Sequence, residues 1–588
     1  MKGLRRAAIR FVATAAAVAA VTVAPAASAA TFALANARVH TEDASHPWAT
    51  ALVVRDDTIA YVGDAGTAEW QRLVVPGTPV HDLKGRLVLP GFIDAHTHPG
   101  LTAIFGSGDP ATDAREAMPA PDRAGTLAWL KRYAKAHPHE KQVVLGAWDV
   151  ASFLPNGPDK RDLDAIWPHT PVVLTDNSGH SVWVNSAMLS RLGIDARTPD
   201  LSPGISVFVR DAHGEPTGWI KEFAASAALM PMLVPPPPRF RARLAAQLAY
   251  LSSHGVTSLF DGGNVGLEDT VYRELAALDR AGRLPIRYFG SYHIWDPAQI
   301  DHAVAEVRRL RAAYGGPHLR FDTVKIHYDG VFEVLTAAMI DPYATEPSNH
   351  GAVLFDHARL ARFIVELEHE HLNLHLHVVG DRGTREALDA IDEATRLMGH
   401  RPTIQVTLCH LQIVDPADFA RLAQPGVHAN FTPHWFGGTE FGRAGLVTLG
   451  RDRAARDEQV GTAWNAGADI SFSSDVTSSD EIPRTNPFVG LEMAMTRRDY
   501  AGGVDLYDRP RLPAEELSLE QSLMAYTLGG ARQLGIAAET GSLEAGKKAD
   551  FLVVSHGPFG VPATQVHAAH VDAVFLEGRL TAGSLAPR

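Results

Sequence analysis

The chain lacks three features that mark whole classes of proteins. Its 588 residues include one cysteine, Cys409, so no intrachain disulfide can form and a large core must stabilise the fold. The formal net charge is −13, whereas a nucleic-acid partner would favour a basic face. We find no internal repeat. With 46% hydrophobic and 21% charged residues, the composition is that of an ordinary globular protein.

The N-terminus has the pattern of an export signal. A basic head precedes an apolar stretch at residues 11–25, and Ala27-Ser28-Ala29 matches the small-x-small cleavage pattern. This stretch is short and alanine-rich, which argues against a retained membrane anchor. We therefore expect residues 1–30 to be a signal peptide and the mature protein to be secreted or periplasmic. Arg5-Arg6 leaves open whether export uses the Sec or the twin-arginine route.

Both ends of the remaining chain have the alternating pattern of short strands. It occurs at residues 32–41 and 51–63, with a matching pair at 549–554 and 571–578. The simplest architecture joins the two ends in one small β-sandwich, formed by residues 31–86 and 538–588.

Between these ends, strand-like and helix-like segments alternate. Amphipathic helices are predicted at residues 297–314, 357–371 and 384–398. The apolar runs that end in polar residues are 87–93, 256–260, 286–290, 323–328, 372–379, 404–410, 427–431 and 468–475. Eight such units predict an α/β fold of the (β/α)₈ TIM-barrel type over residues 87–537. The first interval needs a long insertion, roughly residues 100–250, with further strands at 143–148 and 172–175.

Functional groups of such barrels lie at the C-terminal ends of the strands. Residues two apart on a strand project to the same side, so His96 and His98 can grip one metal ion. The strand ends taken together bring four imidazoles, one lysine and one carboxylate to the same mouth: His96, His98, Lys325, His377, His410 and Asp475. Such a joint arrangement predicts a metal site.

Several motifs carry a family resemblance across nearly the whole mature chain. They lie at residues 90–98, 179–186, 324–325 with 329–330, 377–381, 410–412, 473–475 and 541–550. In this combination the sequence resembles the metal-dependent amidohydrolase superfamily. It is most similar to the branch of long, YtcJ-like enzymes related to N-substituted formamide deformylases (amidohydrolase family 3).

The resemblance implies a role for each residue at the predicted mouth. It implies that His96, His98, His377 and His410 bind one or two divalent metal ions, most often zinc, and that Asp475 is the catalytic carboxylate. Lys325 matches a lysine that many members carboxylate to bridge two metals. The alternative is an ammonium paired with Asp329 or another acid, which would favour one metal.

Four residues are candidates for contact with the substrate. By resemblance, His180 and Asn185 border the substrate pocket, although a structural hydrogen-bonding pair is the alternative. His327 shares a strand face with Lys325 and is a candidate for contact with substrate or metal. Trp148 is a candidate pocket residue, with core packing as its alternative. We expect His375, two residues deeper than His377, to lie in the core or behind a metal ligand.

The sequence therefore predicts an exported hydrolase that cleaves a carbon–nitrogen bond of an amide, formamide or cyclic amide. Metal-activated water would attack, with Asp475 as general base and then acid. The same residues could serve a carbamate, an ester or ring deamination. A non-catalytic binding or regulatory barrel is the alternative of another class. We expect a small-molecule substrate and no nucleic acid; homo-oligomer formation stays open.

Overall fold

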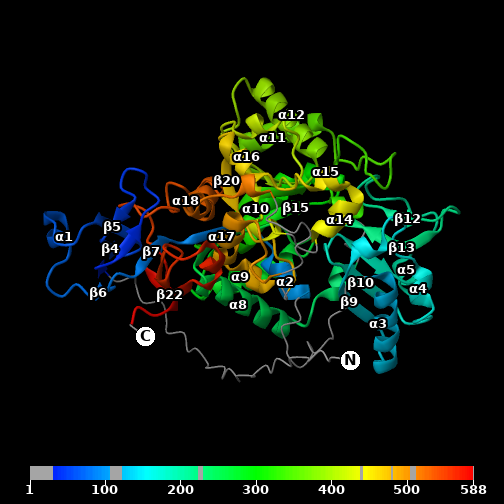
Figure 1. Ribbon diagram of the computed structural model, residues 1–588, viewed down its shortest axis with the longest axis horizontal. Helices are drawn as coiled ribbons and strands as arrows, with labels where there is room; N and C mark the ends of the chain where they lie inside the picture. The colour runs from blue at the N-terminus through cyan, green and yellow to red at the C-terminus, as the bar shows by residue number, and fades with distance from the viewer. Residues whose placement is uncertain are drawn as a thin grey trace, which may run out of the picture.

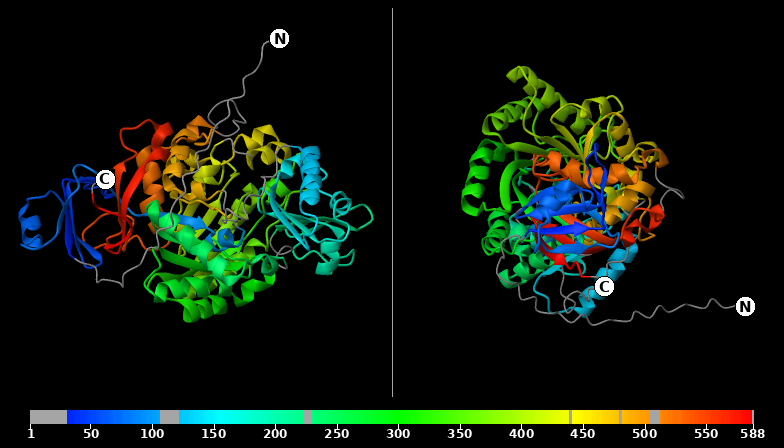
Figure 2. Two further views of the ribbon diagram at one scale, coloured as in Figure 1. Left: turned by 90° about the horizontal axis from the view of Figure 1, so that it is seen from below. Right: turned by 90° about the vertical axis from the view of Figure 1, so that its left-hand side faces the viewer.

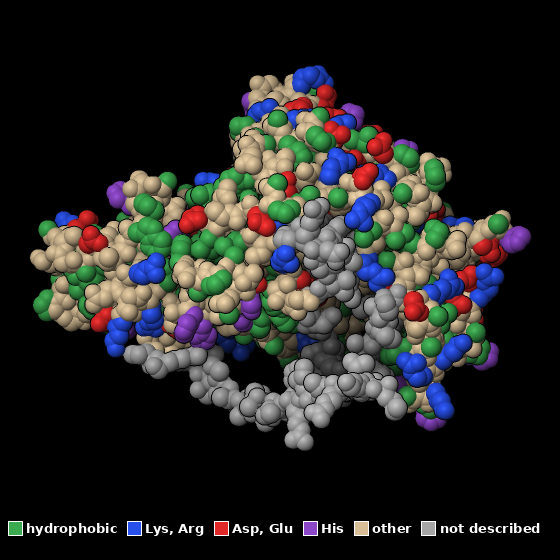
Figure 3. Space-filling view, viewed as in Figure 1, with side chains coloured by type: hydrophobic (Ala, Val, Ile, Leu, Met, Phe, Trp, Pro, Cys, Tyr) green, Lys and Arg blue, Asp and Glu red, His purple; other side chains and the backbone are tan. Residues whose placement is uncertain are grey.

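The computed structural model describes residues 31–105, 122–222, 229–437, 441–478, 481–502 and 512–586. The predicted signal peptide lies outside the described residues. Among the described helices, none combines the length and apolar character needed to cross a bilayer. A central barrel has a β-sandwich at one end and the insertion at the opposite end (Figures 1 and 2). Acidic and basic side chains are interspersed over the face shown in Figure 3.

The barrel is one sheet of eight parallel strands, which confirms the predicted fold. In spatial order they are β20 (Asp469–Phe472), β19 (Val427–Phe431), β18 (Val406–His410), β17 (Asn373–Val378), β16 (Leu319–His327), β15 (Arg287–Ile294), β14 (Val256–Asp261) and β8 (Phe92–Thr97). The segment that follows β20 closes the gap to β8, because Asp475 N donates a hydrogen bond of 2.9 Å to His96 O. The strand ends therefore surround a single mouth.

Helices surround this sheet, as the amphipathic pattern predicts. The first predicted helix begins as a 3₁₀ turn, Pro297–His302, capped by Asp296, and continues as α10. The principal barrel helices are α8 (Pro237–Ser253), α9 (Glu268–Arg280), α10 (Ala303–Tyr314), α11 (His357–Glu370), α12 (Asp381–Met398), α16 (Val460–Asn465), α17 (Pro487–Thr496), α18 (Leu519–Met524) and α19 (Gly530–Gln533).

The predicted first strand, residues 87–93, requires a correction. It is two strands, β7 (Leu87–Pro90) and β8, separated by Gly91. β7 belongs to the sandwich, whereas β8 pairs with β14 of the barrel. A Cβ atom at Gly91 would lie 2.1 Å from Thr257 Oγ1, so only glycine fits this crossing. One apolar run thus supplies two separate cores.

The sandwich combines strands from both ends of the chain. One sheet has the order β5 (Thr58–Gly63), β4 (Ala51–Arg55), β1 (Phe32–Ala35), β6 (Val80–Asp82). The other has the order β23 (Arg579–Gly583), β22 (His570–Leu576), β21 (Phe551–His556), β7, β2 (Arg38–His40), β3 (Trp48–Ala49). Helix α1 (Ala68–Leu73) covers the first sheet through Trp70.

A buried ion pair joins the sandwich to the barrel. Arg287, at the start of β15, donates from Nη1 to Asp550 Oδ2 at 2.9 Å and from Nη2 to Glu577 Oε1 at 2.8 Å. Asp550 also accepts hydrogen bonds from Thr540 Oγ1 and from the backbone N of Glu577. Asp550, the last residue of the 541–550 motif, therefore anchors one domain to the other.

The insertion forms its own mixed sheet and confirms the two additional strands. Its order is β12 (Phe208–Arg210), β13 (Pro216–Lys221), β11 (Ser181–Val184), β10 (Val172–Asp176), β9 (Val143–Trp148), accompanied by α3 (Arg123–Ala136), α4 (Lys160–Asp164) and α5 (Ser186–Leu192). Its aromatic core packs against Phe332 and Leu335 in the loop after β16. The bulky residues of that loop thus join the insertion to the barrel.

Candidate metal centre

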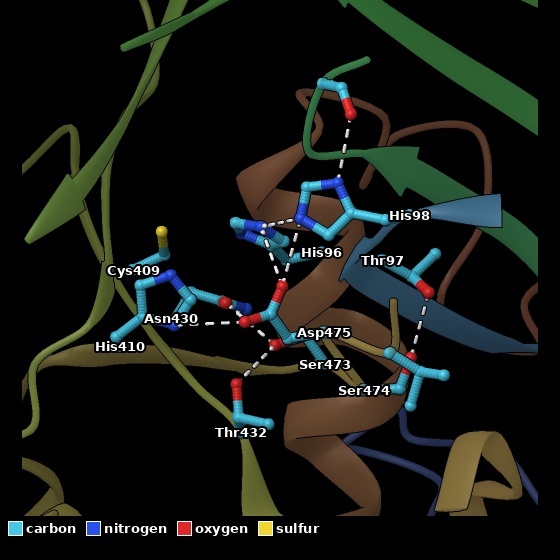
Figure 4. A network of polar contacts seen from close by, with 12 residues as sticks. His96, Thr97, His98, Cys409, His410, Asn430, Thr432, Ser473, Ser474 and Asp475 are labelled. Carbon is cyan, nitrogen blue, oxygen red and sulfur yellow. Dashed lines mark hydrogen bonds and ion pairs between the residues drawn. The ribbon is translucent and has the colours of Figure 1, made fainter. Parts of the chain in front are cut away.

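Three side chains converge where β20 meets β8 (Figure 4). His96 Nε2 and His98 Nε2 lie 3.2 Å apart. Asp475 Oδ1 lies 3.3 Å from His96 Nε2 and 3.1 Å from His98 Nε2. The three atoms therefore form a nearly equilateral triangle at the mouth of the barrel.

This triangle fits a divalent metal ion. Two atoms bound to one zinc ion at about 2.0–2.1 Å in tetrahedral geometry are about 3.3 Å apart, close to the separations observed. His98 Nδ1 lies 3.0 Å from Gly263 O, which fixes the ring proton on Nδ1 and leaves the Nε2 lone pair for a metal. Histidine ligands typically donate their second N–H in this way.

His96 is supported by a second histidine. His375 Nε2 lies 2.8 Å from His96 Nδ1, and both rings are buried. Behind His375, Gln533 Nε2 donates a 2.7 Å hydrogen bond to Ala95 O and lies 3.5 Å from His375 Nδ1. His375 therefore holds the His96 ring from behind, in agreement with the expectation from its depth on the strand.

His377 and His410 lie beside the triangle. Their ring centroids are 4.5 Å apart, and His410 Nδ1 is 3.7 Å from Asp475 Oδ2. Within the described part of the chain, His410 Nδ1 is buried without a hydrogen-bond partner. A buried nitrogen of this kind favours a ligand that completes its interactions.

The electrostatics favour metal binding. Burial holds the pKa values of His96 and His377 well below the usual range and lowers that of His410 to about 3. Neutral imidazoles keep the lone pair that a metal needs. Burial opposes ionisation of Asp475, but the neighbouring His410 and His98 bring its pKa down to about 2. The site thus combines neutral nitrogens with an ionised carboxylate.

Lys325 reaches the same place from β16. Its Nζ donates to Cys409 Sγ at 3.3 Å and lies 3.5 Å from His96 Nε2. Asp329, the alternative partner, instead accepts backbone hydrogen bonds from Val379, Gly380 and Ala338. Lys325 therefore does not pair with Asp329, whereas an ammonium paired with another acid stays a prediction. Burial lowers the pKa of Lys325, which favours its uncharged amine.

Backbone conformations at the mouth are unusual. His410 and Asp475 have φ values of 78° and 47°, in the left-handed region that non-glycine residues rarely adopt. Asp94 accepts hydrogen bonds from the backbone N (2.9 Å) and Oγ (2.6 Å) of Ser474, the residue before Asp475. Conformations of this kind cluster at functional sites, where surrounding contacts maintain them.

The predicted substrate contacts separate into two groups. His180 and His327 lie at the mouth, stacked with ring centroids 5.4 Å apart. Asn185 is instead fully buried and caps α5 by accepting a hydrogen bond from Met188 N. Its side chain also accepts from Val172 N and donates to Trp167 O. Trp148 is also fully buried, and its indole N–H donates to Leu174 O. The structure corrects both predictions: Asn185 and Trp148 support the insertion from its core.

Two residues at the mouth escaped the sequence analysis. Glu222, which follows β13, accepts hydrogen bonds from His180 and His327. His293 lies buried near the end of β15, next to Gly263 and 6.3 Å from His327 between ring centroids. The predicted third strand ended at residue 290, so the strand-end criterion missed His293. A longer strand assignment would have included it.

A barrel with histidines and a carboxylate at the C-terminal ends of its strands defines the class of hydrolases that use a divalent metal. The family comparison places the chain within this class. The model described as "Amidohydrolase family" matches residues 79–582, and the chain belongs to this family.

Individual relatives agree with this assignment. The chain is 26% identical to the N-substituted formamide deformylase of Arthrobacter pascens over 93% of this chain and 97% of that protein. It is 29% identical to the exoenzymes regulatory protein AepA of Pectobacterium carotovorum subsp. carotovorum over 68% and 84%. An uncharacterized metal-dependent hydrolase from Pyrococcus horikoshii OT3 has the same fold, with a TM-score of 0.64, 22% identity and coverage of 91% and 99%. The family match and the similarities to YtcJ of Bacillus subtilis and to the deformylase confirm the expected branch of YtcJ-like enzymes related to N-substituted formamide deformylases.

Proposed function

We propose that this protein is an exported hydrolase that cleaves the carbon–nitrogen bond of an amide, formamide or cyclic amide. The observation that carries the proposal is the triangle of His96 Nε2, His98 Nε2 and Asp475 Oδ1, with sides of 3.1–3.3 Å. The similarity to an N-substituted formamide deformylase supports the choice of a carbon–nitrogen bond.

Asp475 has the position of a proton carrier. Its Oδ1 lies among the histidine nitrogens, and its Oδ2 lies on the side of His410. In the proposed reaction this carboxylate accepts a proton from the attacking water and returns it to the leaving nitrogen. A divalent cation held by the histidines supplies Lewis-acid chemistry, since it lowers the pKa of water and polarises a carbonyl group.

We further propose zinc as the metal and a carboxylated Lys325 that allows two ions. Neutral histidine nitrogens suit zinc, although availability and geometry also decide selectivity. An uncharged buried amine can react with carbon dioxide, and the resulting carbamate is an anionic oxygen ligand. Lys325 lies within 3.5 Å of His96 and faces the site shared by the other predicted ligands.

Two alternatives use the same fold. Carbamates, esters and ring amines differ from amides at the reacting carbon, yet the same residues could serve them. The second alternative is a non-catalytic function, and its support is the similarity to AepA, which is named as a regulatory protein. The ligand histidines and Asp475 together favour the enzyme.

The test combines metal analysis with a substrate screen. The purified full-length protein should contain divalent metal, lose hydrolytic activity with a chelator, and regain it with zinc or manganese. N-formyl amines, N-acyl amino acids, carbamates and esters form the panel. Hydrolysis of amides or formamides above the other classes is expected. Absence of bound metal, without rescue by added metal, would favour the regulatory alternative.

Export is tested separately. We expect the protein released from cells to lack residues 1–30, which include the Ala27-Ser28-Ala29 pattern, and N-terminal sequencing would reveal this. An unprocessed N-terminus in the cell interior would contradict it.

A further inference from the structure

The Glu222 carboxylate is surrounded by hydrogen-bond donors. Oε2 accepts from His180 Nδ1 at 2.8 Å and from His327 Nε2 at 3.2 Å. Oε1 accepts from Val331 N at 3.3 Å and from Thr336 Oγ1. These four donors from the described part of the chain fit the lone-pair positions of an ionised carboxylate. The side chain is 1% exposed, so these contacts replace water almost completely.

These contacts distinguish the cluster from a second metal site. The 2.8 Å between His180 Nδ1 and Glu222 Oε2 is a hydrogen-bond length, shorter than the roughly 3.3 Å between two ligands of one zinc ion. Burial opposes ionisation of Glu222, but His180 and His327 hold its pKa well below the usual range. Glu222 is therefore a fixed anion that accepts the ring N–H of each histidine.

A backbone hydrogen bond also joins Glu222 to His180. Glu222 N donates a 2.7 Å hydrogen bond to His180 O, where β13 lies beside β11. Glu222 has a φ of 61°, a left-handed conformation that surrounding contacts must maintain. A Cβ atom at Gly330 would lie 2.5 Å from Glu222 Oε1, so glycine makes room for the carboxylate. The backbone at His180, at Glu222 and at Gly330 thus accommodates this one side chain.

The histidines bound by Glu222 lie against a predicted metal ligand. The His327 ring stacks on His377 with 3.9 Å between centroids, and the His180 ring lies 5.5 Å from His377. Exposure increases outward through the cluster: 1% for Glu222, 5% for His327 and 16% for His180. His180 is the member of the three that solvent reaches most.

We propose that Glu222 is a positioning residue that fixes the His180 ring beside His377, so that Nε2 of His180 hydrogen-bonds the substrate. This inference rests on the hydrolytic function proposed above. A buried carboxylate that accepts the Nδ1–H of an imidazole sets its tautomer and its ring plane, which directs the opposite nitrogen. The two histidine contacts reach Glu222 from the insertion and from β16, so the carboxylate also aligns the insertion with the barrel.

A double-mutant cycle tests the proposal on the full-length, metal-loaded protein. Glu222→Gln replaces one acceptor oxygen by an N–H₂ group, and His180→Gln removes the ring. Each should lower kcat/KM by about 100-fold, the size expected for a misplaced group. Because Glu222 acts through His180, the double variant should be no slower than His180→Gln. Metal content should not change.

Glu515→Gln is the matched control. Glu515 is a buried glutamate that accepts from Thr462 N at 2.7 Å and from Thr462 Oγ1 at 2.6 Å, on the α16 side of the barrel. Its substitution should leave kcat/KM unchanged. Should Glu222→Gln fold poorly, Glu222→Asp keeps the charge but withdraws it by one methylene group. It should show the same loss of kcat/KM, and full activity would overturn the positioning role.

A readout independent of substrate completes the experiment. The His180 ring N–H resonance, identified by its loss in His180→Gln, should move in Glu222→Gln and stay in place in Glu515→Gln. If no panel substrate is hydrolysed, the proposed function fails while this measurement still tests the contact. An unmoved resonance, multiplicative losses in the double variant, or loss of metal from Glu222→Gln would each overturn the proposal.

Discussion

Asp475→Asn tests the proposed chemistry most directly. The asparagine has nearly the same shape, so its Oδ1 can remain 3.1–3.3 Å from the nitrogens of His96 and His98. Its Oδ2 position becomes an amide nitrogen, which cannot accept a proton. General acid–base catalysis contributes about 10²–10⁴-fold, equivalent to about 3–5 kcal/mol of barrier. We therefore expect kcat to fall by that factor while metal stays bound to the histidines.

The assay measures kcat on the best panel substrate, metal per chain, and the melting temperature. Asp469→Asn is the matched control, because Asp469 begins β20, the strand that leads to Asp475, and pairs with His428 and Arg532. It should retain kcat within about twofold. A value of kcat within tenfold of wild type for Asp475→Asn would refute the proton-carrier role. Loss of metal together with activity would assign Asp475 to metal binding alone.

Three further substitutions have defined outcomes. Lys325→Ala should reduce metal from near two ions per chain to near one, as counted by elemental analysis; an unchanged count would remove Lys325 from the ligands. Asp550→Asn leaves the buried guanidinium of Arg287 with a single carboxylate partner, Glu577. It should lower the free energy of unfolding, measured by urea denaturation, by about 3 kcal/mol. A decrease below about 1 kcal/mol would contradict the role of Asp550 in joining the sandwich to the barrel. Hydrogen bonds to Asp279 and Glu577 raise the pKa of His318 to about 9. A raised folded-state pKa stabilises fully below about pH 6.5, and this contribution disappears as pH rises through 9. His318→Gln should therefore be less stable than wild type by about 1–3 kcal/mol at pH 6 and nearly equal to it at pH 10.

The sequence predicted those parts of the fold that depend on local patterns. Buried parallel strands appear as apolar runs, so the eight strands were found, and the side chains at their ends follow from barrel geometry. The pattern predicts one strand for the first run, because apolar character alone does not reveal which core receives each half. Only the tertiary clash at Gly91 marks the crossing.

The residues behind the mouth depend on contacts between distant segments. Glu222 meets His180 within the insertion and His327 at the end of β16, and its left-handed backbone has no local sequence signal. For Asn185, the motif at residues 179–186 does not separate a helix cap from a substrate contact, and for Trp148 the residue type alone does not separate a core ring from a pocket wall. These roles can be told apart only when the atoms that contact each side chain are known.

The sandwich strand β7 has a consequence for how the protein is made. It pairs with β21, which follows all eight barrel strands in the sequence, so the ribosome delivers β21 only after the barrel strands. Until then one edge of β7 stays open, and exposed edges recruit other strands. Pairing between remote segments is also slow. The nascent barrel therefore has an unpaired strand edge beside its first histidine-bearing strand, so aggregation during translation should be greatest after the barrel strands emerge and before β21 follows.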